Sequence, residues 1–344
     1  MIVRSRSPLR LGLAGGGTDV SPYSDQFGGY VLNVTINLYA HCTIELLDNP
    51  TVVFDAQDMG QSWTGRADYP LPLVDVLVLH KAVYNRIMRQ FNSQQTIGLR
   101  MVTRSDAPPG SGLGSSSSMV VAMLAAYKQL LSLPLDEYDM AHLAYEIERV
   151  DCAMAGGKQD QYAATFGGFN FMEFNANDLV VVNPLRVHRH IEIELHSRMM
   201  LYFTGISRES ARIIEEQVES ANYFNLGNDS LMAMHEIKQT ALQIKECLLK
   251  GDLNAISQII HAAWDAKKRT SLAITNSHID LVANTALAAG AYALKVSGAG
   301  GGGFMMILAD SCAHMHIEKA LSGLGGYVQK FQFTHEGAES WLVI

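Results

Sequence analysis

The chain has 344 residues, of which 48% are hydrophobic and 17% are charged, so it can bury a large core. Its 26 basic and 34 acidic residues give a formal net charge of −8, which argues against nucleic acid as a partner. The longest apolar stretch, residues 119–127, is much shorter than the roughly 20 residues that cross a bilayer. The N-terminal segment reaches glycines before a secretory apolar region can form. We therefore expect a cytoplasmic protein with no membrane span.

The first half of the chain alternates segments with strand-like and helix-like periodicity. Glycines punctuate it, in clusters within residues 15–17 and 108–118 and in pairs at 156–157 and 167–168. Between them, alternating or β-branched runs predict strands, and longer apolar or amphipathic runs predict helices. The predicted strands are 30–38, 40–46 and 98–103, and the predicted helices are 74–91, 116–131 and 138–150.

The second half predicts several helices beside a set of short strands. Such grouping is typical of an α+β fold rather than of a doubly wound parallel sheet. We place a domain boundary within residues 175–189, which gives an N-terminal domain over 1–180 and a C-terminal domain over 181–344. The predicted strands are 191–195, 199–204, 291–296, 304–308 and 327–333, and the predicted helices lie within 208–223, 230–249, 253–267, 278–289 and 313–321.

The segment with the sequence PPGSGLGSSSS precedes an apolar run that predicts a buried helix. Glycines let backbone N–H groups converge, serines can cap the helix, and a helix N-terminus favours anions, so the segment predicts a phosphate-binding loop. A plain linker would not stand between a strand and a buried helix. The segment is not a Walker A loop, because serine rather than lysine follows Gly114. The candidate ligands are Pro109, Gly110, Ser111, Gly112, Leu113, Gly114, Ser115, Ser116 and Ser117.

A second glycine cluster, at residues 298–303, contains a literal G-x-G-x-x-G pattern. A dinucleotide-binding fingerprint requires a helix after the glycines, whereas strands are predicted on both sides here. We therefore expect a second backbone wall against the same ligand, with Gly300 and Gly301 near the substrate. A purely structural hairpin turn is the alternative.

Three motifs together resemble those of the GHMP kinases, the family of galactokinase, homoserine kinase, mevalonate kinase and phosphomevalonate kinase. In chain order they are RLGLAGGGTD, PPGSGLGSSSS and KVSGAGGGG, and they span residues 10–303. The resemblance implies a two-domain α+β fold, with an N-terminal left-handed βαβ domain and a ferredoxin-like C-terminal domain. It also implies ATP and Mg²⁺ at the seam between the domains. The oligomeric state stays open, with a homodimer as one alternative.

The resemblance also implies roles for individual residues in phosphoryl transfer. Asp160 would accept the proton of the sugar hydroxyl. Arg10 would lie beside this aspartate, keep its carboxylate ionised and steady charge in the transition state. Lys158, two positions before Asp160, could perform either task. Ser116 and Glu148 would hold Mg²⁺, although Glu146 lies nearly as close to the apolar stripe of the same predicted helix.

The sugar site is expected at Gly15, Gly16, Gly17, Thr18 and Asp19. Galactokinases have a Gly-Glu-His-Thr-Asp stretch that contacts the hexose, so two polar side chains are replaced here by glycines. Our hypothesis is that the vacated volume accommodates a longer, phosphorylated end of the sugar, while Asp19 accepts bonds from its hydroxyls. A phosphorylated sugar then needs a local cluster of cations, for which the candidates are Arg208, Lys158, Arg212, Lys267 and Lys268. The alternative for each is an ordinary solvated side chain on an exposed helix.

Three shorter motifs, AGGGTD, TGISR and GGKQDQ, are most similar to the branch of the family that phosphorylates heptose 7-phosphate. The implied reaction transfers phosphate from ATP to the anomeric (C1) hydroxyl of D-glycero-D-manno-heptose 7-phosphate. Its 1,7-bisphosphate product would lead to nucleotide-activated heptose for surface polysaccharide. The enzymatic alternative is a fucokinase-like enzyme for an unphosphorylated sugar, and the other alternative is a non-catalytic binding or regulatory protein of the same fold.

Overall fold

Two long strands organise the first of two sheets in the computed structural model, which describes residues 1–207, 210–221 and 228–343. Strands β1 (Ile2–Ala14) and β2 (Gly29–Leu46) pair antiparallel along most of their length. The first half of β2 also pairs with β6 and its second half with β5, so β2 links the two ends of the sheet. The order is β12-β1-β2-β5-β3-β4, with β6 and β7 extending the other end of β2. The remaining strands are β3 (Thr51–Ala56), β4 (Gln61–Arg66), β5 (Leu99–Ser105), β6 (Phe169–Phe174), β7 (Val180–Pro184) and β12 (Glu339–Leu342).

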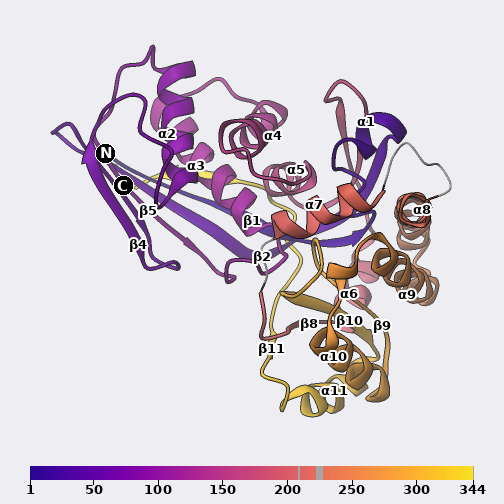
Figure 1. Cartoon of the computed structure of the whole chain (residues 1–344). Coiled ribbons are helices and arrows are strands. Elements are labelled where there is room, and N and C mark those ends of the chain that lie inside the picture. Colours follow the sequence, from indigo (N-terminus) through magenta and orange to yellow (C-terminus); the bar gives the residue numbers. More distant parts are fainter. Residues whose placement is uncertain (208–209, 222–227, 344) are drawn as a thin grey trace.

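Helices cover one face of this sheet (Figure 1). The central one, α3 (Ser115–Leu131), is buried on every side from Ser117 to Tyr127, which confirms the predicted buried helix. It packs between the sheet and α2, and its apolar residues form one core with those of β2, β3 and β5. The other helices of this region are α1 (Tyr23–Phe27), α2 (Val78–Phe91), α4 (Glu137–Glu146), which continues into a π-helical turn at Ile147–Asp151, and α5 (Gln159–Phe166).

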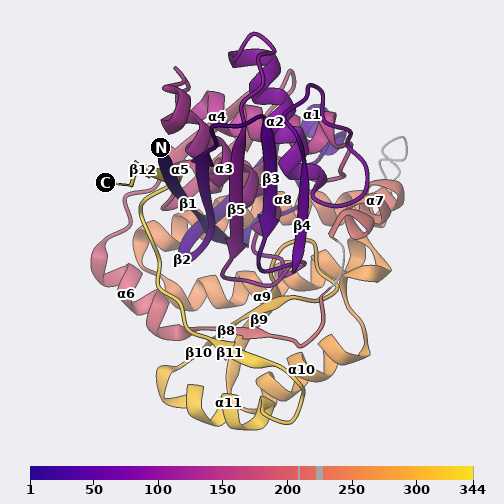
Figure 2. The same ribbon diagram turned by 90° about the vertical axis from the view of Figure 1, so that its left-hand side faces the viewer.

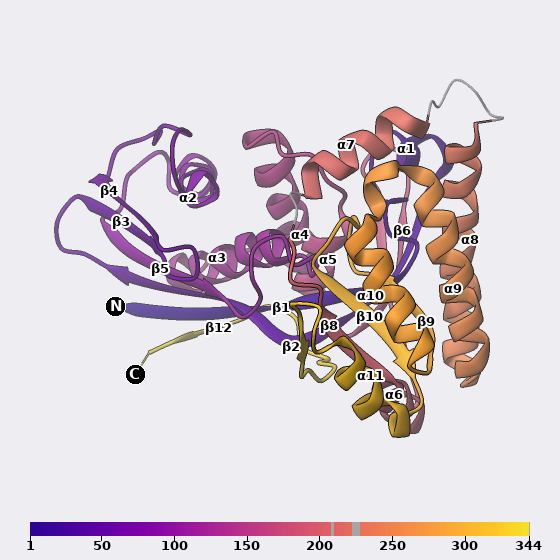
Figure 3. The ribbon, with the colours of Figure 1, turned by 60° about the horizontal axis from the view of Figure 1, so that its bottom comes forward.

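The second sheet has four antiparallel strands in the order β11-β8-β10-β9. In the chain, helices lie between β8 and β9, β10 follows β9 directly, and α11 lies between β10 and β11. This βαββαβ order with this strand arrangement is the ferredoxin-like topology, as predicted. Figure 2 shows α10 and α11 beyond this sheet, and Figure 3 shows α8 and α9 side by side along it. The elements are α6 (Arg189–Arg198), β8 (Met199–Phe203), α7 (Ser210–Ala221), α8 (Asp229–Lys250), α9 (Leu253–Thr270), α10 (Ser277–Ala288), β9 (Ala291–Val296), β10 (Phe304–Ala309), α11 (His314–Leu321) and β11 (Tyr327–Gln329).

One hydrophobic core crosses the seam between the two sheets. Leu9 and Val34 of the first sheet belong to the same buried cluster as Leu201 and Phe304 of the second. The chain also passes from one sheet to the other twice. It leaves the first sheet only after β7, beyond residue 180, and it returns at β12, which pairs with β1. The N- and C-termini therefore lie side by side (Figure 1), and the two halves are held by shared packing. A division of the chain at residue 180 remains our proposal.

The strand predicted at residues 191–195 is wrong, because this segment lies in α6. Its apolar residues alternate with glutamates, which is typical of a strand, but Ile191 and Leu195 are buried whereas Ile193 is 53% exposed. Burial at positions four apart is the helical pattern, and the two buried side chains join the core at the seam. The pieces predicted at 30–38 and 40–46 form the single strand β2. None of the described helices is both long and apolar enough to cross a membrane.

Candidate active site

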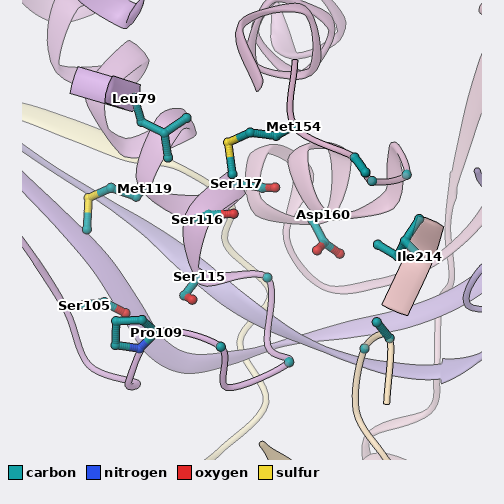
Figure 4. Close-up of a pocket in the computed structure, with 18 of the residues that line it drawn as sticks. Leu79, Ser105, Pro109, Ser115, Ser116, Ser117, Met119, Met154, Asp160 and Ile214 are labelled. Atoms are coloured by element: carbon teal, nitrogen blue, oxygen red, sulfur yellow. The ribbon is translucent and has the colours of Figure 1, made fainter. Parts of the chain in front are cut away.

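The glycine-serine segment forms a tight loop between β5 and α3. Gly110, Gly112 and Gly114 have φ values of 69°, 76° and 77°, in the left-handed region that favours glycine. Gly114 is the N-cap of α3, so no side chain caps the first turn, and the prediction that a serine would cap it is wrong. The uncapped N–H groups at this helix end can bind an anion. Figure 4 shows Ser115, Ser116 and Ser117 along the start of α3, beside the cavity.

The second glycine cluster lies behind this loop. Backbone N–H of Phe304 donates to Ser111 O at 2.9 Å, and a Cβ at Gly298 would lie 2.8 Å from Gly112 O. Side chains at these positions would displace the loop, so the cluster supports it from behind. Gly298 and Ala299 line the cavity, whereas Gly301 N donates to Ile274 O at 2.8 Å and Gly300 packs against the same residue. The structure thus places the predicted substrate ligands Gly300 and Gly301 against protein backbone.

Arg10 and Asp160 meet beneath the loop, as the resemblance implied. Asp160 lies in the first turn of α5, and Arg10 Nε donates to its Oδ1 at 2.7 Å. Arg10 Nη1 also donates to Gly112 O at 2.6 Å, so a single guanidinium joins β1, α5 and the loop. Asp160 remains 22% exposed and lines the cavity, whereas Arg10 is buried. A Cβ at Gly114 would approach the Asp160 carboxyl carbon to 3.1 Å, so glycine permits this close approach.

Lys158 does not join this pair. Its Nζ lies 2.5 Å from Asp178 Oδ1, in the turn between β6 and β7, and 5.3 Å from the ring centre of Tyr145. The side chain is buried among these partners, and Lys158 is absent from the described lining of the cavity. Its surroundings indicate that it links α5 to the β6–β7 turn.

Glu148 and Glu146, which periodicity alone does not separate, have different partners in the structure. Glu148 is completely buried and accepts from Ser116 Oγ at 3.0 Å, from Ser117 Oγ at 2.6 Å and from the Gln161 amide. Glu146 instead pairs with Arg86 Nη1 at 2.6 Å. Glu148 lies in the π-helical turn, which holds more residues per turn than an α-helix. Its side chain therefore faces a different direction from the one that α-helical spacing predicts. Sequence analysis missed Gln161, whose only signal is its place in the GGKQDQ motif.

The Gly15–Asp19 stretch is held by its own side chains. Thr18 Oγ1 donates to Gly15 O at 2.8 Å, which fixes the turn. Asp19 accepts from Gly17 N at 3.1 Å and from Gln159 N at 3.0 Å. Its carboxylate therefore lies at the N-terminus of α5, the helix that carries Asp160, and is almost completely buried while bordering the cavity. Asp19, expected to bind sugar hydroxyls, thus also orients the start of α5.

Two buried lysines lie along the same stretch. Lys267 Nζ donates to Gly16 O at 3.0 Å, and burial lowers its pKa to about 8 despite the opposing charge of Asp19. Lys295 Nζ donates to Gly12 O at 2.9 Å, and burial together with Lys267 and Arg10 lowers its pKa to about 7. Basic side chains are therefore gathered at this wall. Lys295 begins the KVSGAGGGG motif but was not among the predicted site residues.

The other predicted cations contribute less to the described site. Arg208 lies outside the described residues, as does the side chain of Arg212. Lys268, the next residue on α9, is 36% exposed and pairs with the exposed Asp265 at 2.7 Å. Of the five candidates, only Lys267 is found among the described residues that line the cavity.

The phosphate loop, Asp160 and Lys267 border one cavity of about 780 Å³, together with Arg10 and Asp19. Figure 4 shows Leu79 and Met119 at one end, the three serines of α3 in the middle, and Asp160 and Ile214 at the other end. The first end is apolar, with Ala56, Leu77 and Pro109 also in its wall. The cavity can therefore hold an elongated ligand with an apolar ring at one end, anionic groups in the middle and a polar reacting group near Asp160.

His80 borders the apolar end of the cavity and gives a testable pH dependence. Its Nε2 lies 2.8 Å from Thr103 Oγ1, and burial lowers its pKa from 6.5 to about 4. Between pH 6.5 and 4 the unfolded chain therefore binds a proton at His80 that the folded chain does not. The free energy of unfolding falls as the pH falls through that window. When the pH is lowered from 7.5 to 4.5, we expect the free energy of unfolding in urea to fall by about 2–3 kcal/mol more for the wild-type protein than for His80→Gln. Equal losses would contradict the burial of a neutral His80.

Two stretches of the chain match known families, and each contains residues of the site. The family described as GHMP kinases N terminal domain matches residues 78–168, and GHMP kinases C terminal matches residues 244–314. The chain is 46% identical over 342 residues to D-glycero-alpha-D-manno-heptose 7-phosphate kinase of Campylobacter jejuni, covering 99% of both proteins. A crystal structure described as a D-glycero-D-manno-heptose 1-phosphate kinase from Bacteroides thetaiotaomicron is 44% identical, with a TM-score of 0.84 over 99% of both chains. A putative sugar kinase from Campylobacter jejuni has a TM-score of 0.81 at 44% identity, over 99% of this chain and 98% of its own.

Proposed function

The chain belongs to the GHMP kinase family, as its three glycine motifs predicted, and we propose that it phosphorylates the anomeric (C1) hydroxyl of D-glycero-D-manno-heptose 7-phosphate. The products would be the 1,7-bisphosphate and ADP. The observation that carries this proposal is the position of Asp160, paired with Arg10 and directly beneath the uncapped start of α3. The choice of sugar is supported by the whole-length similarity to a relative named for this substrate.

The cavity supports one orientation for ATP, the phosphoryl donor of this family. The adenine ring would lie at the apolar end, against Leu79 and Met119. The phosphates would then reach the loop at residues 110–116, whose glycines leave backbone N–H groups free to turn inward. This orientation directs the γ-phosphate toward Asp160, at the far end of the row of serines.

Asp160 would act as the general base in the transfer. The oxygen of the C1 hydroxyl forms a bond to the γ-phosphorus while the bond from that phosphorus to the β,γ-bridging oxygen breaks. The hydroxyl proton passes to the Asp160 carboxylate, and the electron pair of the broken bond leaves on ADP. Arg10 holds the carboxylate through a 2.7 Å bond, so the base is oriented before the substrate arrives.

The residues around Glu148 fit a magnesium ion. Mg²⁺ prefers hard oxygen ligands and keeps several waters, so one carboxylate and one hydroxyl suffice beside the phosphates of ATP. Glu148 supplies a carboxylate with no cation closer than Arg149, 3.8 Å away, among the described residues. Ser116 bonds to Glu148 and is exposed to the cavity. When bound there, the ion would neutralise charge on the transferred phosphoryl group.

The proposed product carries a phosphate on its anomeric carbon. Nucleotide activation of a sugar requires an anomeric phosphate, which this transfer would supply. We therefore propose that the enzyme contributes to nucleotide-activated heptose for surface polysaccharide, and that it works in the cytoplasm, where ATP is available.

The first experiment measures ADP release with MgATP against a panel of acceptors. The panel contains the heptose 7-phosphate, the heptose 1-phosphate, unphosphorylated heptose, fucose, galactose and mannose. We expect kcat/KM for the 7-phosphate to exceed that for each neutral sugar by roughly 100-fold, because a charged group contributes about 1.5–3 kcal/mol through its hydrogen bonds. Turnover restricted to fucose would favour a fucokinase-like enzyme, and turnover of the 1-phosphate would favour the reaction for which the Bacteroides relative is named. No turnover at all would favour the non-catalytic alternative.

A further inference from the structure

A continuous chain of contacts leads from the phosphate loop to Lys267. Gly114 of the loop packs on Asp160, and the neighbouring Gln159 bonds to Asp19 through both its backbone N–H and its amide. The Gly17 turn beside Asp19 then packs on Lys267, whose Nζ would lie 2.9 Å from a Cβ at Gly17. In this series of contacts, Asp160 and Gln159 stand between the loop and the residues that contact the ammonium of Lys267.

Gln217 adds a second donor at the same wall. Its Oε1 lies 3.5 Å from Lys267 Nζ, and its Nε2 is buried without a hydrogen-bond partner among the described residues. Both residues line the cavity. Gln217 follows Ile214 by three positions on α7, so the two side chains share one face of the helix, and Figure 4 shows Ile214 at the Asp160 end of the cavity. A buried amide donor without a partner is costly unless a ligand satisfies it.

We propose that Lys267 and Gln217 form the subsite for the phosphate group of the acceptor sugar, at the end of the sugar opposite the hydroxyl that reacts at Asp160. The inference rests on the proposed function and assigns residues that bind its substrate. An ammonium and an amide N–H₂ are both donors, and a phosphate offers only acceptors. The lysine charge is otherwise offset, among described residues, by Asp19 and by dipoles such as Gly16 O.

This subsite explains the glycines in the Gly15–Asp19 stretch. Where galactokinases have glutamate and histidine, this chain has Gly16 and Gly17. The ammonium of Lys267 lies directly over Gly17, where a side chain would collide with it, and it donates to the Gly16 carbonyl. The space left by the two missing side chains is thus partly filled by a cation that reaches it from α9, which suits an anionic group on the sugar.

The arrangement also separates this subsite from the phosphates of ATP. The donors predicted for ATP are the uncapped start of α3 and the loop before it, where Gly114 contacts Asp160 directly, whereas Lys267 is linked to Asp160 only through Gly17, Asp19 and Gln159. Glu148, the proposed magnesium ligand, bonds to Ser116 and Ser117 at the start of α3. An acceptor with its C1 hydroxyl at Asp160 would therefore extend away from ATP, toward Lys267 and Gln217.

The test compares Lys267→Met with Lys268→Met in the full chain. Both changes remove one positive charge from α9, but Lys268 pairs with Asp265 on the exposed face. We expect Lys267→Met to raise KM for the heptose 7-phosphate by roughly 10- to 100-fold, with KM for ATP and kcat/KM for unphosphorylated heptose changed less than about threefold. Lys268→Met should leave all three constants unchanged. A parallel loss on the phosphorylated and unphosphorylated sugars would overturn the proposal.

Gln217→Glu provides a second variant that preserves side-chain shape. It keeps an oxygen for Lys267 but replaces the amide donor with a carboxylate, which repels phosphate. We expect KM for the 7-phosphate to rise by about 10-fold or more while thermal unfolding is unchanged. Wild-type protein is the reference for both variants: if it turns over the 7-phosphate but neither variant changes KM, the subsite is wrong and the function stands. If wild-type protein prefers a neutral sugar, the proposed function itself fails.

Discussion

Asp160→Asn should lower kcat by roughly 10²- to 10⁴-fold, the range for loss of a positioned general base. Asparagine has the same shape and retains an oxygen for the 2.7 Å bond from Arg10 Nε, so the loop and α5 should keep their positions. KM for ATP and for the heptose 7-phosphate should change by less than about threefold, because the substitution affects the transition state more than ground-state binding. Steady-state ADP release gives the rate constants, and calorimetry with ADP gives nucleotide affinity.

Lys158→Met is the matched comparison for this prediction. Lys158 is two residues away, yet its ammonium bonds to Asp178, so its removal should leave kcat nearly unchanged while lowering thermal stability. A loss of kcat equal to that of Asp160→Asn would place Lys158 at the reacting centre, against the geometry. A loss below about 10-fold for Asp160→Asn would show that positioning of the two substrates alone accounts for the rate.

The local parts of the site could be predicted from the sequence. The phosphate loop, the helix after it and the glycine hairpin each form within a short stretch of chain, so glycines, serines and an apolar run carry their signals directly. The partnership of Arg10 and Asp160 came from the resemblance to known kinases, because 150 residues separate them and no periodicity links them.

The remaining parts depend on tertiary packing. Strand β1 was missed because Pro8 interrupts it and because its buried positions include the polar residues Ser5, Ser7 and Arg10, which do not follow an apolar pattern. The π-helical turn at Ile147–Asp151 changes which glutamate faces the serines, and a single extra residue in a turn has no clear sequence signal. Lys267 reaches Gly16 across 251 residues, so its position depends on how α9 packs against β1.

Glu148→Gln tests the proposed magnesium site and should lower kcat by roughly 10³-fold, since a bound ion contributes several kcal/mol to stabilising charge in phosphoryl transfer. Glutamine preserves the shape; its oxygen can accept from Ser117 while its amide donates to the Ser116 hydroxyl, so the start of α3 should be retained. The affinity of the protein–ADP complex for Mg²⁺, measured by calorimetry, should fall by about 10- to 100-fold. Higher Mg²⁺ concentrations should then restore part of the activity.

Glu146→Gln is the matched control, because it makes the same chemical change two residues away. Glu146 is 36% exposed and pairs with Arg86, which also bonds to Asp151 Oδ1 at 2.7 Å, so the arginine keeps a partner after the change. We expect Glu146→Gln to leave kcat and Mg²⁺ affinity unaltered and to lower stability by about 1 kcal/mol at most. If the two variants lose Mg²⁺ affinity equally, the assignment of Glu148 is wrong. If only Glu148→Gln does so, Glu148 is the metal-binding carboxylate, and it lies in the π-helical turn where it bonds to the serines of α3.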